Sequence, residues 1–334
     1  MATALGSALL GLKFFEELPA RDAAGQPIIG ARTPLNLDAY EGAARLVAMA
    51  AAALGECSDD PPGSGPAAPA PLLLCLPEPN QRFAPSDVLA DVCNQVGPAI
   101  DGAQSRVILG GRCALFTALD QAERLLSAGA ARDVYVGAVD SLIDREPLDN
   151  LFRAGRIRTG TSEGFVPGEG AGFLRLRLRA DRDTRALLVG TGQADEPTSR
   201  DGDQADELPN AEPNLGAALA LAAQAALRAA ALHASAASAI VHSASGDRRD
   251  FREAGFAVTR LRPRADPPIS VWTPASAAGE LGAGYGPFAL ALAAHFLQQE
   301  VTPGPAVLIL AADDGPNRCA AVVAPAPGYA PSRR

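Results

Sequence analysis

Two parts of the chain carry the same order of apolar runs, and this repeat constrains the fold more than any other feature. In each part, a strand-like run and a turn precede a helical segment, and two further strand-like runs follow. The first copy consists of residues 105–110, 114–128, 133–139 and 172–178, and the second of residues 269–272, 287–298, 306–311 and 319–324. Such self-similarity predicts an internal duplication in which each copy forms a similar unit.

The individual runs indicate layered α/β structure. Residues 72–76 are wholly apolar, as in a strand covered on both faces, whereas 172–178 alternates apolar residues with arginine, as in a half-exposed strand near a sheet edge. Residues 114–128 place apolar side chains at helical spacing. Further strands are predicted over 186–190 and 239–242, and a helix over 214–233. Strands that alternate with helices predict sheets covered by helices.

The repeat predicts two halves, residues 1–184 and residues 185–325, followed by a disordered tail over 326–334. Residues 58–71 are rich in Pro, Gly and Ala and predict a flexible surface loop. Residues 195–213 contain many acids and few apolar side chains and predict a second exposed loop. At 334 residues, the chain is long enough for two such halves.

Composition excludes several classes of partner and site. The net charge of −9 argues against nucleic acid and against an anionic membrane, because phosphates would repel the chain. No apolar stretch reaches the ~20 residues that a membrane helix needs. Five cysteines without CxxC spacing and three scattered histidines indicate neither a disulfide framework nor a metal centre. We therefore expect a cytoplasmic protein without a metal or other cofactor.

The segment from Val134 to Leu178 carries the most specific motifs. It contains Gly-Ala-Val-Asp at 137–140 and the glycine-rich sequence GFVPGEGAG at 164–172, directly before a predicted strand. These motifs and their order resemble β-ketoacyl synthases. Upstream, ALFTALDQAERLLSAG resembles the helix after the family nucleophile; downstream, ASAAGELGAGYG (275–286) and GPNRCAAVV (315–323) resemble two later family motifs.

The resemblance implies a thiolase fold, in which two βαβαβαββ halves form α-β-α-β-α layers, and it covers most of the chain from about Ile100. It implies that the start of the first half is shortened. It also implies a homodimer, or a heterodimer with another thiolase-fold protein, because the family associates through the edge strand near the nucleophile turn. Acyl carrier protein is a further implied partner.

Alignment with the family places an arginine where the nucleophile belongs. Counting back along the helix from Leu119 puts Arg112 at the nucleophile position and Cys113 one residue later. A guanidinium stays protonated and cannot attack a thioester. One residue rotates a helical side chain by ~100°, so Cys113 is displaced from the family position. Cys113 has two interpretations. It is either a thiolate activated by a helix N-terminus or a small buried hydrophobic residue, and the second interpretation is favoured.

Three other family positions bear on the same pocket. His242 aligns with the first family histidine and is either a pocket imidazole or a strand-end histidine bonded to backbone. Glu280 stands at the second histidine position, with Ala275 at the preceding lysine position, and a carboxylate is a poor donor to an oxyanion. Asn317 belongs to the final motif. An ion pair between Arg112 and Glu280 would explain both substitutions together.

The remaining motif residues favour structural roles. Asp140, Gly168, Glu169 and Gly170 lie in glycine-rich sequence, where we expect tight backbone packing and a carboxylate that binds buried N–H groups or an arginine. Residues 247–250 (DRRD) predict a solvated loop.

These observations favour a degenerate 3-oxoacyl-ACP synthase-like pseudoenzyme of bacterial type, not an active acyltransferase. Its expected role is a dimerising partner, like a chain length factor, or an adaptor in a type VI secretion cluster that binds a secretion effector. The alternative is an active 3-oxoacyl-ACP synthase or acyltransferase that uses Cys113 and His242.

Overall fold

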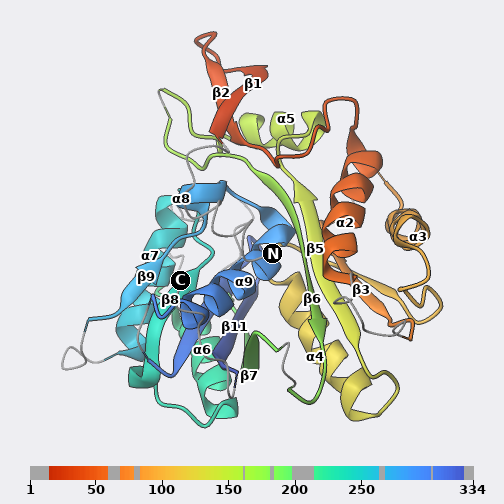
Figure 1. Cartoon of the computed structure of the whole chain (residues 1–334). Helices are drawn as coiled ribbons and strands as arrows, with labels where there is room; N and C mark the ends of the chain where they lie inside the picture. Colours follow the sequence, from red (N-terminus) through yellow and green to blue (C-terminus); the bar gives the residue numbers. More distant parts are fainter. Residues whose placement is uncertain are drawn as a thin grey trace. The chain divides into compact units, whose positions relative to one another are not determined.

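The computed structural model (Figure 1) describes residues 15–58, 68–78, 83–160, 162–180, 184–197, 214–262, 268–301 and 304–326. Most of the two predicted loops, 58–71 and 195–213, and nearly all of the predicted tail lie outside these residues. The chain divides into two compact units, one of Met1–Arg179 with Ala275–Phe288 and one of Ala180–Pro274 with Ala289–Arg334. In the described part of the chain, no helix is long and apolar enough to cross a membrane.

A four-stranded sheet forms the centre of the first unit, with strand order β4-β3-β5-β6 among the described residues. β3 pairs in parallel with β4 and β5, and β6 pairs antiparallel with β5. The elements of this unit are β1 (Phe15–Arg21), β2 (Pro27–Ala31), α2 (Gly42–Ser58), β3 (Leu72–Leu76), α3 (Pro85–Val96), β4 (Arg106–Leu109), α4 (Ala114–Ser127), β5 (Val134–Ser141), α5 (Arg145–Arg153), β6 (Glu169–Leu176), α8 (Ala275–Ala278) and η2 (Gly282–Gly284).

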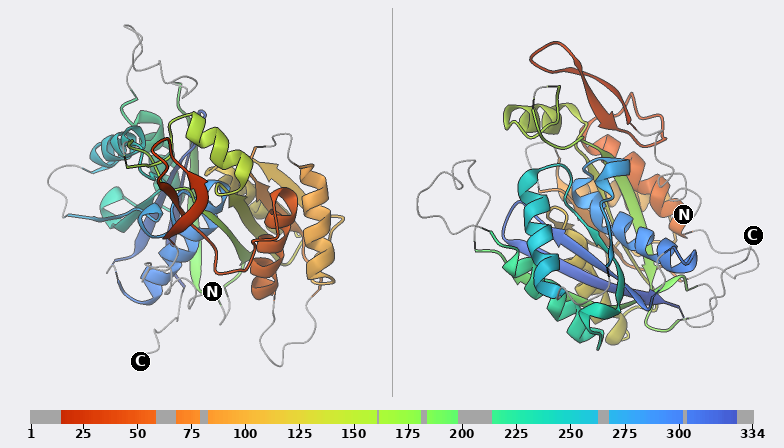
Figure 2. Two further views of the ribbon diagram at one scale, coloured as in Figure 1. Left: turned by 90° about the horizontal axis from the view of Figure 1, so that it is seen from above. Right: turned by 90° about the vertical axis from the view of Figure 1, so that its left-hand side faces the viewer.

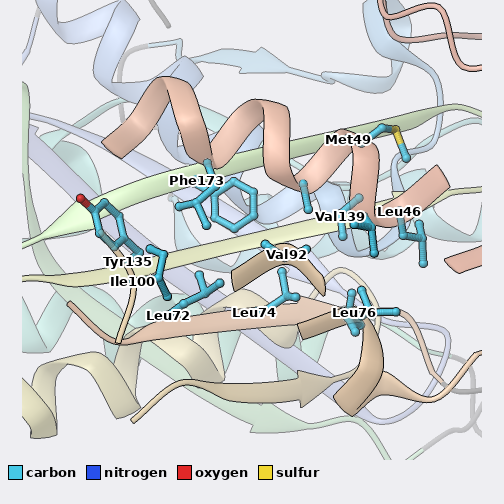
Figure 3. Close-up of a cluster of buried hydrophobic side chains, with 14 of the residues drawn as sticks. Leu46, Met49, Leu72, Leu74, Leu76, Val92, Ile100, Tyr135, Val139 and Phe173 are labelled. Carbon is cyan, nitrogen blue, oxygen red and sulfur yellow. The ribbon is translucent and has the colours of Figure 1, made fainter. Parts of the chain in front are cut away.

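Helices α2 and α3 cover one face of this sheet, and apolar side chains fill the space between them and the strands (Figure 3). Leu72, Leu74 and Leu76 pack with Leu46 of α2 and Val92 of α3 in one buried cluster. Alternate residues of a strand point to opposite faces, so the remaining residues of β3 point to the other face. Every residue of β3 and β5 is buried, which requires cover on both faces, and α4 contacts both strands.

The second unit contains a five-stranded sheet with strand order β7-β11-β10-β8-β9. Its elements are β7 (Ala186–Asp195), α6 (Ala217–Ala229), η1 (Ala234–Ala236), β8 (Ala237–His242), α7 (Arg248–Leu261), β9 (Ser270–Trp272), β10 (Ala306–Ala312) and β11 (Asn317–Pro325). Helix α9 (Tyr285–Gln298) runs from the first unit into the second. Helices α6 and α7 lie side by side (Figure 2) and share a buried cluster with β8, β10 and β11.

The backbones of helix α6 and strand β7 lie in direct contact because both elements carry small residues. A Cβ atom on Gly190 would lie 2.2 Å from the carbonyl oxygen of Ala226, and one on Gly192 would lie 2.1 Å from that of Ala222. Both distances are far shorter than van der Waals contact. The alanine-rich sequence of α6 is therefore matched to glycines in the strand it covers.

The strand pairings confirm the predicted duplication. β4, β3, β5 and β6 have the counterparts β9, β8, β10 and β11, and in both sets the pairings are parallel, parallel and antiparallel in that order. Among the described residues, β6 is the last strand of the first sheet. Most of its residues are half-buried, as its alternating sequence predicts. The loop prediction for residues 247–250 is wrong: Asp247 caps α7 by accepting a hydrogen bond from the Arg249 amide (2.9 Å), and the helix begins at Arg248.

Candidate functional site

The turn between β4 and α4 positions Arg112 and Cys113. Strand β4 ends at Leu109, α4 begins at Ala114, and Cys113 is the N-cap residue with helical backbone angles. Both side chains are buried, with residue exposures of 6% for Arg112 and 3% for Cys113. The turn therefore carries a cation into the interior at the start of a helix, where a positive dipole end does not stabilise positive charge.

Glu280 is held opposite this turn by its own backbone. Its amide donates to the carbonyl of Val166 (2.8 Å), and its carbonyl accepts from the amide of Gly168 (2.9 Å). Residues 167 and 280 thus form a short parallel bridge. A Cβ atom on Gly168 would lie 2.5 Å from the Ala278 carbonyl oxygen, so this glycine permits the close approach.

Arg112 and Glu280 form the ion pair that the sequence suggested. The Arg112 Nε donates to Glu280 Oε1 at 3.0 Å, and a terminal guanidinium nitrogen lies 3.0 Å from Oε2. Both side chains are nearly inaccessible, at 7% and 4% exposure. The amide of Gly282 adds a further hydrogen bond to Oε1 (2.8 Å). Oε1 therefore accepts both hydrogen bonds, whereas among the described residues Oε2 makes the charge contact with Arg112 but no hydrogen bond.

Tyr285 and Asp140 complete the polar cluster around this pair. Burial raises the pKa of Tyr285 well above its usual value, and the neighbouring Cys113 and Glu280 raise it further, against the lowering effect of Arg112. The Asp140 carboxylate accepts from the amides of Ser141 (2.8 Å) and Ala283 (3.0 Å). The phenol therefore remains neutral, and Asp140 binds backbone amides, one of them in the segment that follows Glu280.

Gly282 is required where this segment passes Asp140. Its φ of +52° lies in the left-handed region, and a Cβ atom there would meet the Asp140 carboxylate oxygen at 2.1 Å. Only glycine fits both conditions without displacement.

Glu169 holds together the elements next to this cluster. Its carboxylate accepts two hydrogen bonds from Arg45 of α2 (2.6 and 2.9 Å) and one from the Ser141 hydroxyl (2.9 Å). The amide and hydroxyl of Thr33 lie at 3.3 and 3.4 Å. Arg45 also donates to the carbonyls of Leu37 and Tyr40. Gly170 lies beside Glu169 in β6, opposite Asp140 in β5.

His242 ends strand β8 in the second unit and has partners on both ring nitrogens. Nδ1 accepts from the amide of Ala244 (3.2 Å), which fixes the proton on Nε2, and Nε2 then donates to the Thr273 hydroxyl (3.2 Å). The ring also meets Phe251 edge-on, with centroids 5.7 Å apart. Burial lowers the pKa of His242 to about 4, so the ring is neutral at pH 7.

Asn317, the other pocket candidate in the second unit, is exposed at the start of β11. Its neighbour Arg318 is buried and forms a two-point ion pair with Glu253 of α7 (2.5 and 3.2 Å). Arg318 also donates to the carbonyls of Asp313, Gly315 and Asn317. This arginine therefore fixes the turn between β10 and β11 to helix α7.

Of the sequence candidates, Arg112, Cys113 and Glu280 belong to one unit, and His242 and Asn317 to the other. Sequence reasoning missed Tyr285, Arg45 and Arg318. Tyr285 stands in the motif segment 275–286, where Glu280 was the unusual residue, whereas no motif or pattern marks Arg45 or Arg318. Within the described ranges, no three His, Cys, Asp or Glu side chains are grouped so that they could hold a metal ion.

Solved structures identify the fold. A ketosynthase in complex with its chain length factor from Xenorhabdus doucetiae matches with a TM-score of 0.71 and 13% identity, over 97% of this chain and 93% of that chain. The ishigamide ketosynthase/chain length factor matches with a TM-score of 0.67 and 19% identity, over 96% and 94%. This chain has the ketosynthase fold.

A ketosynthase domain of oxazolomycin synthesis from Streptomyces albus is also similar, with a TM-score of 0.67 and 15% identity, over 96% of this chain and 70% of that chain. No family model and no curated sequence matches the chain. The likeness confirms the predicted thiolase fold and the resemblance to ketosynthases from which it was drawn.

Proposed function

We propose that this chain is a ketosynthase-like protein without condensing activity, which assembles with a second thiolase-fold chain as a chain length factor assembles with its ketosynthase. The observation that carries the proposal is the buried pair of Arg112 and Glu280. Two of the similar structures are ketosynthases with chain length factors.

The pair is incompatible with decarboxylative condensation at these positions. The reaction needs a thiolate nucleophile and donors that stabilise a developing negative charge. Arg112 at the turn cannot attack a thioester, and Glu280 is a carboxylate already bound to that arginine. The two groups neutralise each other, so neither presents an uncompensated charge to a substrate.

The alternative, in which Cys113 and His242 catalyse acyl transfer, has less support. Cys113 is 3% exposed and is the residue that follows Arg112 in the turn. Both His242 nitrogens are hydrogen-bonded within the protein, and burial lowers the pKa of His242 to about 4. A ring with so low a pKa is a weak general base at pH 7.

The outer edge of β4 supports the assembly proposed. β4 is the terminal strand of its sheet among the described residues, and β3 pairs with its inner edge. Leu109 at the end of β4 is 41% exposed, next to the turn that carries Arg112. An edge strand presents unpaired N–H and C=O groups that can pair with a strand of another chain, and the exposed leucine adds apolar contact, whether the partner is an identical copy or a different thiolase-fold protein. Acyl carrier protein, present in one similar complex with its ketosynthase, is a further candidate partner.

Intact mass after incubation with acetyl- and malonyl-coenzyme A tests the absence of activity. The expected result is an unchanged mass and no release of coenzyme A above the rate without protein. The Cys113→Ala and Cys57→Ala variants serve as a matched pair, since Cys57 is a half-buried thiol in α2. An acyl adduct that persists in Cys57→Ala and disappears in Cys113→Ala would refute the proposal and support the alternative.

A further inference from the structure

We draw no further inference here: the strongest candidate, the outer edge of strand β6 in the first sheet, whose counterpart β11 in the second sheet pairs with β7, carries no proposal because nothing in the described part of the chain shows what covers it.

Discussion

At the scale of single residues, the ion pair of Arg112 and Glu280 makes a prediction about stability. Removal of one partner leaves a buried charge without compensation, so Arg112→Met and Glu280→Met should each lower the free energy of unfolding by roughly 3–5 kcal/mol. Removal of both leaves no unpaired charge. The double variant should therefore lose less than the sum of the two, by at least about 1 kcal/mol. Urea unfolding of the unmodified chain, the two single variants and the double variant measures these losses.

The surface pair of Arg32 and Glu16 is the matched control. Its atoms are also 3.0 Å apart, but the side chains are 29% and 49% exposed. Glu16→Gln should change the free energy of unfolding by no more than about 1 kcal/mol. Strictly additive losses for Arg112 and Glu280 would show that the two side chains do not stabilise each other.

His242 makes a prediction about pH. In the folded chain, burial lowers the pKa of His242 to about 4 from its usual 6.5. Between these values the unfolded chain binds a proton at this residue and the folded chain does not. Stability should therefore fall as pH decreases from about 6.5 to about 4, by roughly 3 kcal/mol from this group. NMR titration of the ring gives the pKa directly, and urea unfolding of His242→Asn should lack this part of the pH dependence; a ring that titrates near 6.5 would contradict the prediction.

At the scale of elements, Glu169 connects four parts of the first unit. It lies in β6 and binds Arg45 of α2, Ser141 of β5 and Thr33 beyond β2. Glu169→Gln should destabilise the chain by roughly 3–5 kcal/mol, because Arg45 is buried. Loss of protection in hydrogen exchange should concentrate in residues 33–45. Glu17→Gln in the exposed face of β1 should leave both measurements unchanged, and a uniform loss of protection would argue against a local connecting role.

Sequence patterns predicted the elements whose apolar residues follow one clear spacing. The wholly apolar β3, the alternating β6 and the striped α4 have the expected types and nearly the expected ends. Helices α2 and α7 were missed for opposite reasons. α2 is apolar on most of its circumference, so it shows no stripe, whereas α7 begins with three charged residues after its Asp247 cap and exposes two phenylalanines. In both, tertiary contacts override the local pattern.

The candidate site was partly predictable for a related reason. Arg112 and Glu280 could be paired from the sequence because two unusual substitutions of opposite charge fell at positions that the ketosynthase resemblance brings together. Arg45 and Arg318 could not be paired with Glu169 and Glu253, since nothing local distinguishes a buried arginine from an exposed one. Their partners lie 124 and 65 residues away in sequence.

At the scale of the whole molecule, the duplicated sheets supply a matched test of assembly. β4 and β9 are counterparts at the ends of their sheets, and each exposes an aliphatic residue: Leu109 at 41% and Val271 at 47%. If assembly uses the β4 edge, a lysine at that edge should oppose association by burying a charge.

We therefore expect sedimentation equilibrium to give the mass of an assembly for the chain, alone or with its thiolase-fold partner, and for Val271→Lys. Leu109→Lys should sediment as a folded single chain under the same conditions. Loss of assembly in Val271→Lys but not in Leu109→Lys would move the interface to the second unit. A single chain in every sample, including mixtures with thiolase-fold proteins encoded beside it, would refute the assembly and leave the inactive site without a structural role. The comparison is informative because both substitutions add the same charge to topologically equivalent strands, so only the location of the interface distinguishes them.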